Sequence, residues 1–191
     1  MSLELYGTPR SHFTRIVRIV CHELDVDYRW IDVGNVAEAE PFGANPLMQV
    51  PVLVDEDLRV FDSHHICCYL VQRQKADPLG INALSWTDYN MLTVIRGVMH
   101  AEVRLVLAER CGMELVGGMF DKTRATLRHG LSWINDGIEE HGEFDYLRAC
   151  AIAMWDHLLL YNNAEKTDAP RLRRILEQFN DRPSITQTRP S

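Results

Sequence analysis

The sequence has no run of lysines or arginines, and its overall charge is negative. Of 191 residues, 27 are Asp or Glu and 20 are Lys or Arg, which gives a formal net charge of −7. Nucleic acids and anionic membrane surfaces attract basic patches. The charge balance therefore argues against both as partners and favours small molecules or proteins.

Long apolar stretches are missing as well. No window reaches the roughly 18 apolar residues of a membrane-spanning helix, and the first residues, MSLELYGTPR, do not read as a secretory signal. The five cysteines are odd in number and show no CxxC spacing. They are typical of reduced thiols rather than of a disulfide framework. We therefore expect an unprocessed, cytoplasmic protein.

The first third of the chain alternates strand and helix patterns. Strands are predicted at residues 3–7 and 26–33, and between them the apolar residues from Phe13 to Leu24 fall at helical spacing. A β-α-β order implies a right-handed crossover and a parallel strand pair.

A second set of patterns completes this unit. The stretches VPVLV and LRVF, joined by the acidic turn at 55–57, predict an antiparallel hairpin. A helix is expected from about Ser63 to Gln72. The expected order is βαβ-αββα, a compact α/β sandwich with a helical element between the second and third strands.

From about Lys75 the pattern is helical throughout. A linker precedes Ser85, which is expected to cap a long helix that ends at Cys111–Gly112. Further helices are predicted at about 118–140, from about Asp145, and after Pro170.

This combination resembles the cytosolic glutathione transferases. The resemblance is carried by NPLMQVPVL (45–53), DSHHICCYL (62–70), SHFTRIVR (11–18) and RPSITQTRP (182–190), the last being similar to the tail of many bacterial members. It points to a bacterial, Ser-type, theta- or beta-like member. It implies the glutathione transferase fold: a thioredoxin-like α/β domain at residues 1–75 that binds glutathione, and an all-α domain at 84–191.

The resemblance assigns the middle of the expected glutathione site to Gln49, Val50 and Pro51. In the family the Val-Pro bond is cis, and the main chain of the Val50 position pairs with the cysteinyl part of glutathione. The alternative is a trans proline that begins an edge strand.

Asp62 and Ser63 stand where the hairpin gives way to a helix. Either residue can simply cap that helix. A helix N-terminus also suits a carboxylate ligand, because its N–H groups are unpaired and carry partial positive charge. The resemblance implies that Ser63 holds the γ-glutamyl carboxylate of glutathione and Asp62 its ammonium group. Both readings can hold together.

Ser11 is the expected catalytic residue, because it matches the Ser that the family places at the start of the first helix. Its hydroxyl would donate a hydrogen bond to the glutathione sulfur and so favour the thiolate. The alternative is that Ser11 only caps the helix. Tyr6 is the fallback donor, since Tyr-type members keep their phenol at the end of the first strand, and Thr8 is a weaker one.

Four features depart from the family pattern. His12 stands beside Ser11 where a Pro is common. Met48 stands where a Gly usually precedes the Val-Pro pair. No Lys or Arg lies between Trp30 and Leu58, so Gln49, Arg10 or another subunit would have to bind the glycyl carboxylate. The capping box usual in a later helix reads Asp145-x-x-Arg148, which keeps the cap and loses its reciprocal acid.

The run SHHICC at residues 63–68 invites a metal interpretation. Four ligands on one and a half helical turns cannot surround an ion tetrahedrally without help from elsewhere. Buried or interfacial side chains are the favoured interpretation, and no metal or cofactor is expected besides glutathione as co-substrate.

The resulting hypothesis is a transferase that activates glutathione as thiolate for attack on a small electrophile, as in detoxification. The alternative is a non-catalytic, glutathione-transferase-like interaction or regulatory module. A thiol-disulfide exchanger is disfavoured, because no cysteine occupies the nucleophile position. A homodimer is expected from the family and from the apolar surplus of the long helix.

Overall fold

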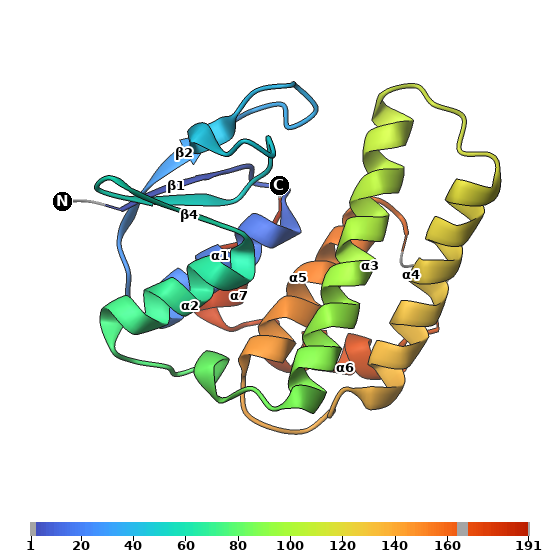
Figure 1. Ribbon diagram of the computed structural model, residues 1–191. Coiled ribbons are helices and arrows are strands. Elements are labelled where there is room, and N and C mark those ends of the chain that lie inside the picture. Colours follow the sequence, from blue (N-terminus) through green and yellow to red (C-terminus); the bar gives the residue numbers. More distant parts are fainter. Residues whose placement is uncertain (1–2, 164–167, 191) are drawn as a thin grey trace. The chain divides into compact units, whose positions relative to one another are not determined.

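The computed structural model describes residues 3–163 and 168–190 (Figure 1). By its internal packing the chain divides into two compact units, Met1–Ala83 with Asp181–Ser191, and Leu84–Asn180. The sequence predicts a glutathione-binding domain at 1–75 and an all-helical domain at 84–191, and these functional domains stay a prediction. The packing itself groups residues 181–190 with the first unit.

The first unit contains a four-stranded sheet with the strand order β2-β1-β3-β4. Its main elements are β1 (Leu3–Gly7), α1 (His12–Glu23), β2 (Tyr28–Asp32), β3 (Val52–Asp55), β4 (Leu58–Phe61) and α2 (Ser63–Gln74). β1 runs parallel to β2 and antiparallel to β3, and β3 pairs with β4 as a hairpin. The predicted parallel pair and the predicted hairpin are both confirmed.

Side-chain alternation explains how this sheet is covered. Leu3 and Leu5 on β1 are buried, whereas Glu4 and Tyr6 between them point to the other face and are partly exposed. The helices α1 and α2 pack against each other, and Figure 1 shows them on one face of the sheet. The middle of the apolar stripe predicted for residues 13–24 is buried on α1, whereas Phe13 and Leu24 at its ends are half-buried.

The helical element expected between β2 and β3 is only a single 3₁₀ turn, so the α-helix of the predicted order does not form. Within residues 33–51 the only helical turn is η1 (Phe42–Ala44), a three-residue 3₁₀ helix that contains Gly43 at φ 55°. Pro41 and Pro46 flank this turn. A proline lacks the N–H that an α-helix interior needs, so neither side can extend the turn into a helix.

The second unit consists of helices. They are α3 (Trp86–Arg110), α4 (Gly118–Gly137), α5 (Tyr146–Leu160) and α6 (Pro170–Phe179). The predicted cap at Ser85 is confirmed: its Oγ accepts a hydrogen bond from the backbone N–H of Asp88, whose carboxylate accepts one from the N–H of Ser85, at 3.2 and 2.9 Å. This reciprocal arrangement is a capping box.

The connection from α4 to α5 differs from the expectation of a helix to residue 140. Ile138 is extended and ends α4. The buried guanidinium of Arg148 donates to the carbonyls of Glu139 and His141, at 2.8 and 3.0 Å. These carbonyls are turned toward α5, so they cannot continue the hydrogen-bond ladder of α4. The predicted N-cap at Asp145 is confirmed, since its Oδ1 accepts from the N–H of Arg148 at 2.8 Å.

A short helix not predicted from the sequence, α7 (Pro183–Thr186), packs against α1 within the first unit. Ile185 is fully buried there. Arg182 donates two hydrogen bonds of 2.7 Å to the carboxylate of Glu23, on the last turn of α1. Residues from the far end of the sequence therefore complete the first unit.

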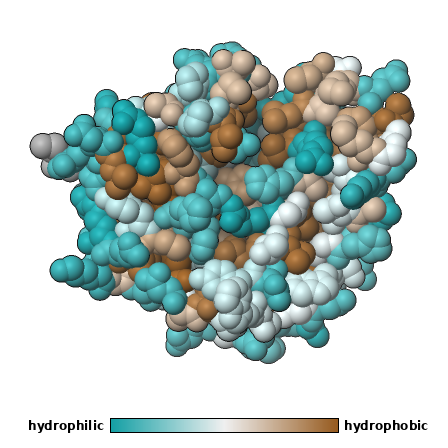
Figure 2. All heavy atoms as spheres, viewed as in Figure 1, coloured by the Kyte–Doolittle hydropathy of each residue, from teal (hydrophilic) through white to brown (hydrophobic). Residues whose placement is uncertain are grey.

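The surface carries some large apolar side chains. Figure 2 shows hydrophobic residues between hydrophilic ones on the face that it draws. On α3, Trp86 is 84% exposed, and its ring lies 5.7 Å from the ring of Tyr89. Among the described residues, no helix is long and apolar enough to cross a membrane.

Candidate functional site

One edge of the sheet gathers the predicted site residues. Tyr6, Val52 and Phe61 are level with one another across β1, β3 and β4. Just beyond this level, β1 leads into α1, the Val50–Pro51 pair leads into β3, and β4 leads into α2. The N-termini of both helices and the Val-Pro peptide thus lie at one edge of the sheet.

Ser11 is the N-cap of α1. Its Oγ accepts a hydrogen bond of 3.2 Å from the backbone N–H of Thr14, and the first turn of α1 contains no acidic residue. A hydroxyl that accepts through one lone pair still has its own hydrogen to donate. The helix N-terminus also contributes partial positive charge. Capping by Ser11 is therefore observed, and it is compatible with donation to a ligand.

The fallback residues are engaged in other contacts. The Tyr6 hydroxyl donates to Glu4 at 3.1 Å, and burial together with this carboxylate raises the pKa of Tyr6 above its ordinary value. Its phenol stays protonated and is already bonded to a carboxylate. The hydroxyl of Thr8 accepts from the backbone N–H of Arg10 at 3.3 Å.

The Val50–Pro51 peptide bond is cis, as the sequence predicted. A residue to which the sequence argument gave no role, Asn45, holds the loop before it. Asn45 is buried, its Nδ2 donates to the carbonyl of Gln49 at 2.8 Å, and its Oδ1 accepts from the N–H of Leu47 at 3.0 Å. The only signal was its place at the head of the NPLMQVPVL stretch. Gln49 itself is exposed.

Asp62 caps α2 in an unusual backbone conformation. Its Oδ1 accepts from the N–H groups of His64 and His65, at 2.9 and 3.4 Å. The φ and ψ angles of Asp62 are 71° and 131°, a region that residues with a side chain rarely adopt. Such backbone outliers concentrate at functional sites. Ser63 follows as the first residue of α2 and is buried.

The SHHICC run lies on the first turns of α2. The Sγ of Cys68 lies 3.7 Å from the Nε2 of His64. Burial, with the negative charge of Asp77 as a smaller cause, raises the pKa of the Cys68 thiol. A protonated thiol is a poor metal ligand and a poor nucleophile. The Cys68 thiol is therefore protonated at neutral pH.

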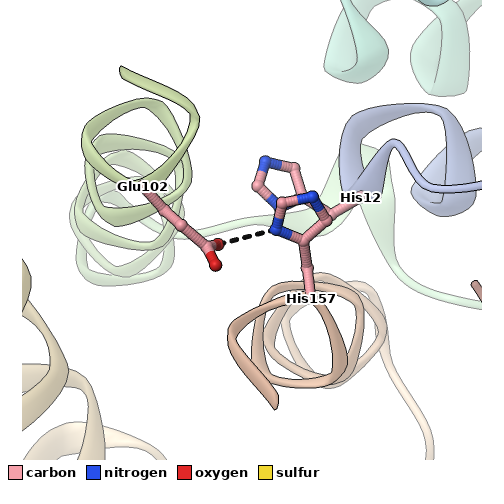
Figure 3. A group of neighbouring side chains, drawn as sticks. All are labelled: His12, Glu102 and His157. Carbon is pink, nitrogen blue, oxygen red and sulfur yellow. Dashed lines mark hydrogen bonds and ion pairs between the residues drawn. The ribbon is translucent and has the colours of Figure 1, made fainter. Parts of the chain in front are cut away.

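The helical unit contains a buried polar pair that no sequence signal indicated. The Nδ1 of His157 on α5 lies 2.8 Å from the Oε2 of Glu102 on α3 (Figure 3). Asn163 donates to the other oxygen of the Glu102 carboxylate at 3.4 Å. The pair joins two helices of this unit across their apolar packing.

The first part of the chain is similar in sequence to known glutathione S-transferases. Residues 5–78 match the family model of the glutathione S-transferase N-terminal domain. Glutathione S-transferase F6 of Arabidopsis thaliana is 32% identical over 100 residues, which cover 50% of this chain and 47% of that protein. Glutathione S-transferase 1 of Manduca sexta is 38% identical over 82 residues, which cover 40% of this chain and 38% of that protein. The matched segments thus span less than half the length of these curated relatives.

Solved structures align over the whole chain. A glutathione S-transferase from Methylobacillus flagellatus, solved with glutathione bound, has a TM-score of 0.85 at 25% identity and covers 100% of both chains. A glutathione transferase family member from Pseudomonas fluorescens, also with bound glutathione, has a TM-score of 0.82 at 25% identity, again over 100% of both chains.

A thioredoxin-like α/β domain followed by a helical region is the fold of the glutathione transferases. The chain contains, at residues 5–78, a segment that matches the glutathione S-transferase N-terminal domain, and over its whole length it shares the glutathione transferase fold. Its assignment to a Ser-type, theta- or beta-like subclass stays a prediction.

Proposed function

We propose that this protein is a glutathione transferase whose first unit binds glutathione at the sheet edge described above. The observation that carries the proposal is that the N-termini of α1 and α2 and the Val50–Pro51 peptide share this edge. Two helix N-termini and one open main-chain segment suit an extended, anionic peptide.

Each part of glutathione has a proposed partner. The γ-glutamyl carboxylate binds the hydroxyl and N–H of Ser63, and the ammonium group binds the oxygen lone pairs of Asp62 that capping leaves open. The cysteinyl main chain pairs with Val50, beside Pro51 and Gln49. These assignments rest on the family resemblance and on the common edge.

In the proposed mechanism, Ser11 donates its hydroxyl hydrogen to the glutathione sulfur. The bond stabilises the thiolate, the thiol proton leaves to solvent, and the sulfur forms a bond to the electrophile. In a substitution the leaving group departs with the electron pair of the bond that breaks. In an addition to an activated double bond the π bond breaks, and its electron pair moves to the far end of the double bond, which takes a proton from solvent. No further cofactor enters this scheme, and the identity of the electrophile is open.

Calorimetric titration with glutathione tests the proposal, and Ser63→Ala is the informative variant. We expect binding of the parent protein in the micromolar to low millimolar range, about −8 to −4 kcal/mol, and at least about tenfold weaker binding by Ser63→Ala. Ser85→Ala is the matched control, because it removes a helix-capping serine in the other unit. Absence of binding by the parent protein at about 10 mM would favour the non-catalytic interaction module.

We also propose a homodimer. The supporting observation is the exposed pair Trp86 and Tyr89 on α3, because large aromatic side chains are enriched at interfaces. Light scattering at micromolar protein concentration should give twice the chain mass of 22.0 kDa. A monomer under these conditions would rule the dimer out.

A further inference from the structure

We propose that Asn45 is a positioning residue for glutathione, because its side chain directs the backbone N–H of Val50 toward the cysteinyl carbonyl of the ligand. This inference rests on the proposed function, in which the main chain of Val50 pairs with that of the cysteinyl residue. Asn45 acts without touching the ligand, through the peptide that joins Gln49 to Val50.

Both ends of the Asn45 side-chain amide are engaged. Nδ2 donates to the carbonyl of Gln49 at 2.8 Å, and Oδ1 accepts from the N–H of Leu47 at 3.0 Å. These partners fix which end of the amide is nitrogen, because a carbonyl needs a donor and an N–H needs an acceptor. Asn45 is 3% exposed, so water competes little for either bond. A carboxylate of the same size would keep the acceptor and lose the donor.

The backbone of Asn45 connects this side chain to the sheet. Its N–H donates to the carbonyl of Phe42 at 2.9 Å, and its carbonyl accepts from the N–H of Met48 at 3.0 Å. Phe42 begins η1, and a Cβ added to Gly43 in the same turn would lie 3.0 Å from the side chain of Val52 on β3. Because η1 rests against the sheet, the amide of Asn45 is held in a fixed place.

The peptide between Gln49 and Val50 passes this position on to Val50. A peptide unit is planar, and in its trans form the C=O and the N–H point in opposite directions. The Gln49–Val50 bond is trans. Asn45 holds the C=O of this peptide on the inner side of the loop, so the N–H of Val50 points away from the loop. This is the direction that donation to a ligand beside Val50 requires.

Asn45 controls only one of the two hydrogen bonds proposed for Val50. The N–H of Val50 donates to the cysteinyl carbonyl, whereas the carbonyl of Val50 accepts from the cysteinyl N–H. That carbonyl belongs to the next peptide unit, with Pro51. A peptide plane can turn about the two Cα atoms that flank it and leave the next plane in place. Loss of the Asn45 donor should therefore weaken the first bond and spare the second.

Asn45→Asp tests this division, because it removes the donor to Gln49 and keeps the acceptor for Leu47. Two thiols are titrated by calorimetry: glutathione, and γ-glutamylcysteamine, which keeps the thiol and the cysteinyl N–H but has no cysteinyl carbonyl. We expect the variant to bind glutathione roughly tenfold more weakly than the parent protein does at neutral pH, and γ-glutamylcysteamine within about twofold of the parent protein.

Acid should restore the function of this variant. A protonated carboxyl group carries a donor again, and burial favours the protonated form. Relative to the parent protein at the same pH, Asn45→Asp should therefore regain affinity for glutathione as the pH falls to about 5. If the buried carboxylate prevents folding, Asn45→Ala removes the same donor without a charge, and it should show the same difference between the two thiols.

Asn35→Asp is the matched control. Asn35 is exposed, and its Oδ1 likewise accepts from the N–H two residues on, that of Ala37, at 3.1 Å. This variant should bind both thiols as the parent protein does. If γ-glutamylcysteamine binds too weakly to measure, the amide proton resonance of Val50 decides: glutathione should shift it downfield in the parent protein and not in Asn45→Asp.

The outcomes separate this inference from the proposed function. Equal losses for both thiols would mean that Asn45 only maintains the loop as a whole, and the inference would be wrong. It would also be wrong if Asn45→Asp bound glutathione as tightly as the parent protein, and in both cases the proposed function would stand. If the parent protein does not bind glutathione at about 10 mM, the proposed function fails and takes the inference with it.

Discussion

Met48 shows how a residue can depart from a family pattern while the backbone does not. Its φ angle is 53°, in the left-handed region that favours glycine, and its side chain is 43% exposed. The resemblance places a glycine here. The loop therefore adopts a glycine-like conformation although a methionine occupies the position, and the side chain avoids collision by pointing to solvent.

Replacing Met48 with glycine should relieve this strain. The left-handed conformation costs a residue with a Cβ about 1–2 kcal/mol, and the added freedom of an unfolded glycine offsets roughly 0.5–1 kcal/mol of that. We expect Met48→Gly to raise the free energy of unfolding slightly, measured by urea denaturation. Gln49→Gly is the control, since the φ of Gln49 is not positive, and it should destabilise the protein. Equal losses in both variants would contradict the strain argument.

Ser11 combines two roles that can be separated by experiment. As a cap it contributes about 1 kcal/mol of stability, and as a donor to sulfur it lowers the thiol pKa of bound glutathione. We expect Ser11→Ala to raise that pKa by about 1.5 units, which corresponds to about 2 kcal/mol of thiolate preference. The thiolate population should fall about thirtyfold below both pKa values, and the difference should vanish at high pH.

The measurement for Ser11 is the pH dependence of thiolate absorbance with glutathione bound. Ser85→Ala removes a capping serine in the other unit, so it should lose comparable stability and leave the thiolate curve unchanged. Superimposable curves for Ser11→Ala and the parent protein would remove Ser11 from the mechanism.

At the scale of elements, the connection between α4 and α5 depends on one arginine. The Arg148 side chain holds Asp145 as an ion pair and binds the carbonyls of Glu139 and His141. The acid that a capping box would carry at this position is absent. Instead the guanidinium of Arg148 fills the concave side of the loop.

Gly142 makes room for this guanidinium. Its φ is 152°, and a Cβ there would lie 2.7 Å from the Nη2 of Arg148. Because Arg148 is buried and bonded to three residues, it cannot move away easily. We expect Gly142→Ala to lower the free energy of unfolding by about 2–3 kcal/mol, measured by urea denaturation.

The control for Gly142 is Gly117→Ala. Gly117 also has a positive φ, 96°, but a Cβ there would meet nothing within 4 Å. Its loss should reflect conformational strain alone, of about 1 kcal/mol. A loss at Gly142 no larger than that at Gly117 would show that Arg148 adapts.

Helices, strands and caps could be predicted from the sequence where the residues of one continuous stretch determine them. The buried stripe of α1, the β3–β4 hairpin and the caps at Ser85 and Asp145 follow from local patterns. The end of α4 and the fold of the loop around Asn45 could not be predicted from the sequence. Each depends on one side chain, Arg148 or Asn45, that donates hydrogen bonds to backbone carbonyls several residues away in the sequence. Asp62 was predictable as a cap, but its positive φ was not.

At the scale of the whole chain, residues 181–190 pack with the first unit although helices separate them in sequence. Arg182 and Ser184 both donate to the carboxylate of Glu23. Arg15 on α1 donates to Thr188 and to the carbonyl of Ile185, each at 3.4 Å. Hydrogen bonds therefore flank the buried Ile185.

The carboxylate of Glu23 should make this packing sensitive to acid. Burial alone would raise the pKa of Glu23, but the hydrogen bonds from Arg182 and Ser184 outweigh it and lower the pKa below its ordinary value of 4.5. A lowered folded pKa gives stability that is fully present above 4.5 and is lost as pH falls through the folded pKa.

Glu23→Gln tests this contribution. At neutral pH the variant should be less stable than the parent protein by about 1–3 kcal/mol in urea unfolding, because hydrogen bonds to a charged group are lost. The difference should narrow as pH falls below 4.5. Glu143→Gln, at an exposed position, should follow the parent protein at every pH. A difference that does not vary with pH would mean that the charge of Glu23 contributes nothing.

Because residues 181–190 pack with the first unit, that unit cannot be completed on the ribosome until these residues have been synthesised. Domains generally fold as units while the chain is being synthesised, the N-terminal one first. Here the sheet and its two helices emerge early, but Ile185 and Arg182 are translated only after all of Leu84–Asn180. Until then Glu23 has neither of its partners, and the place of Ile185 beside α1 is unfilled. The unit that begins synthesis is thus the one that is completed later, and the helical unit can finish before it.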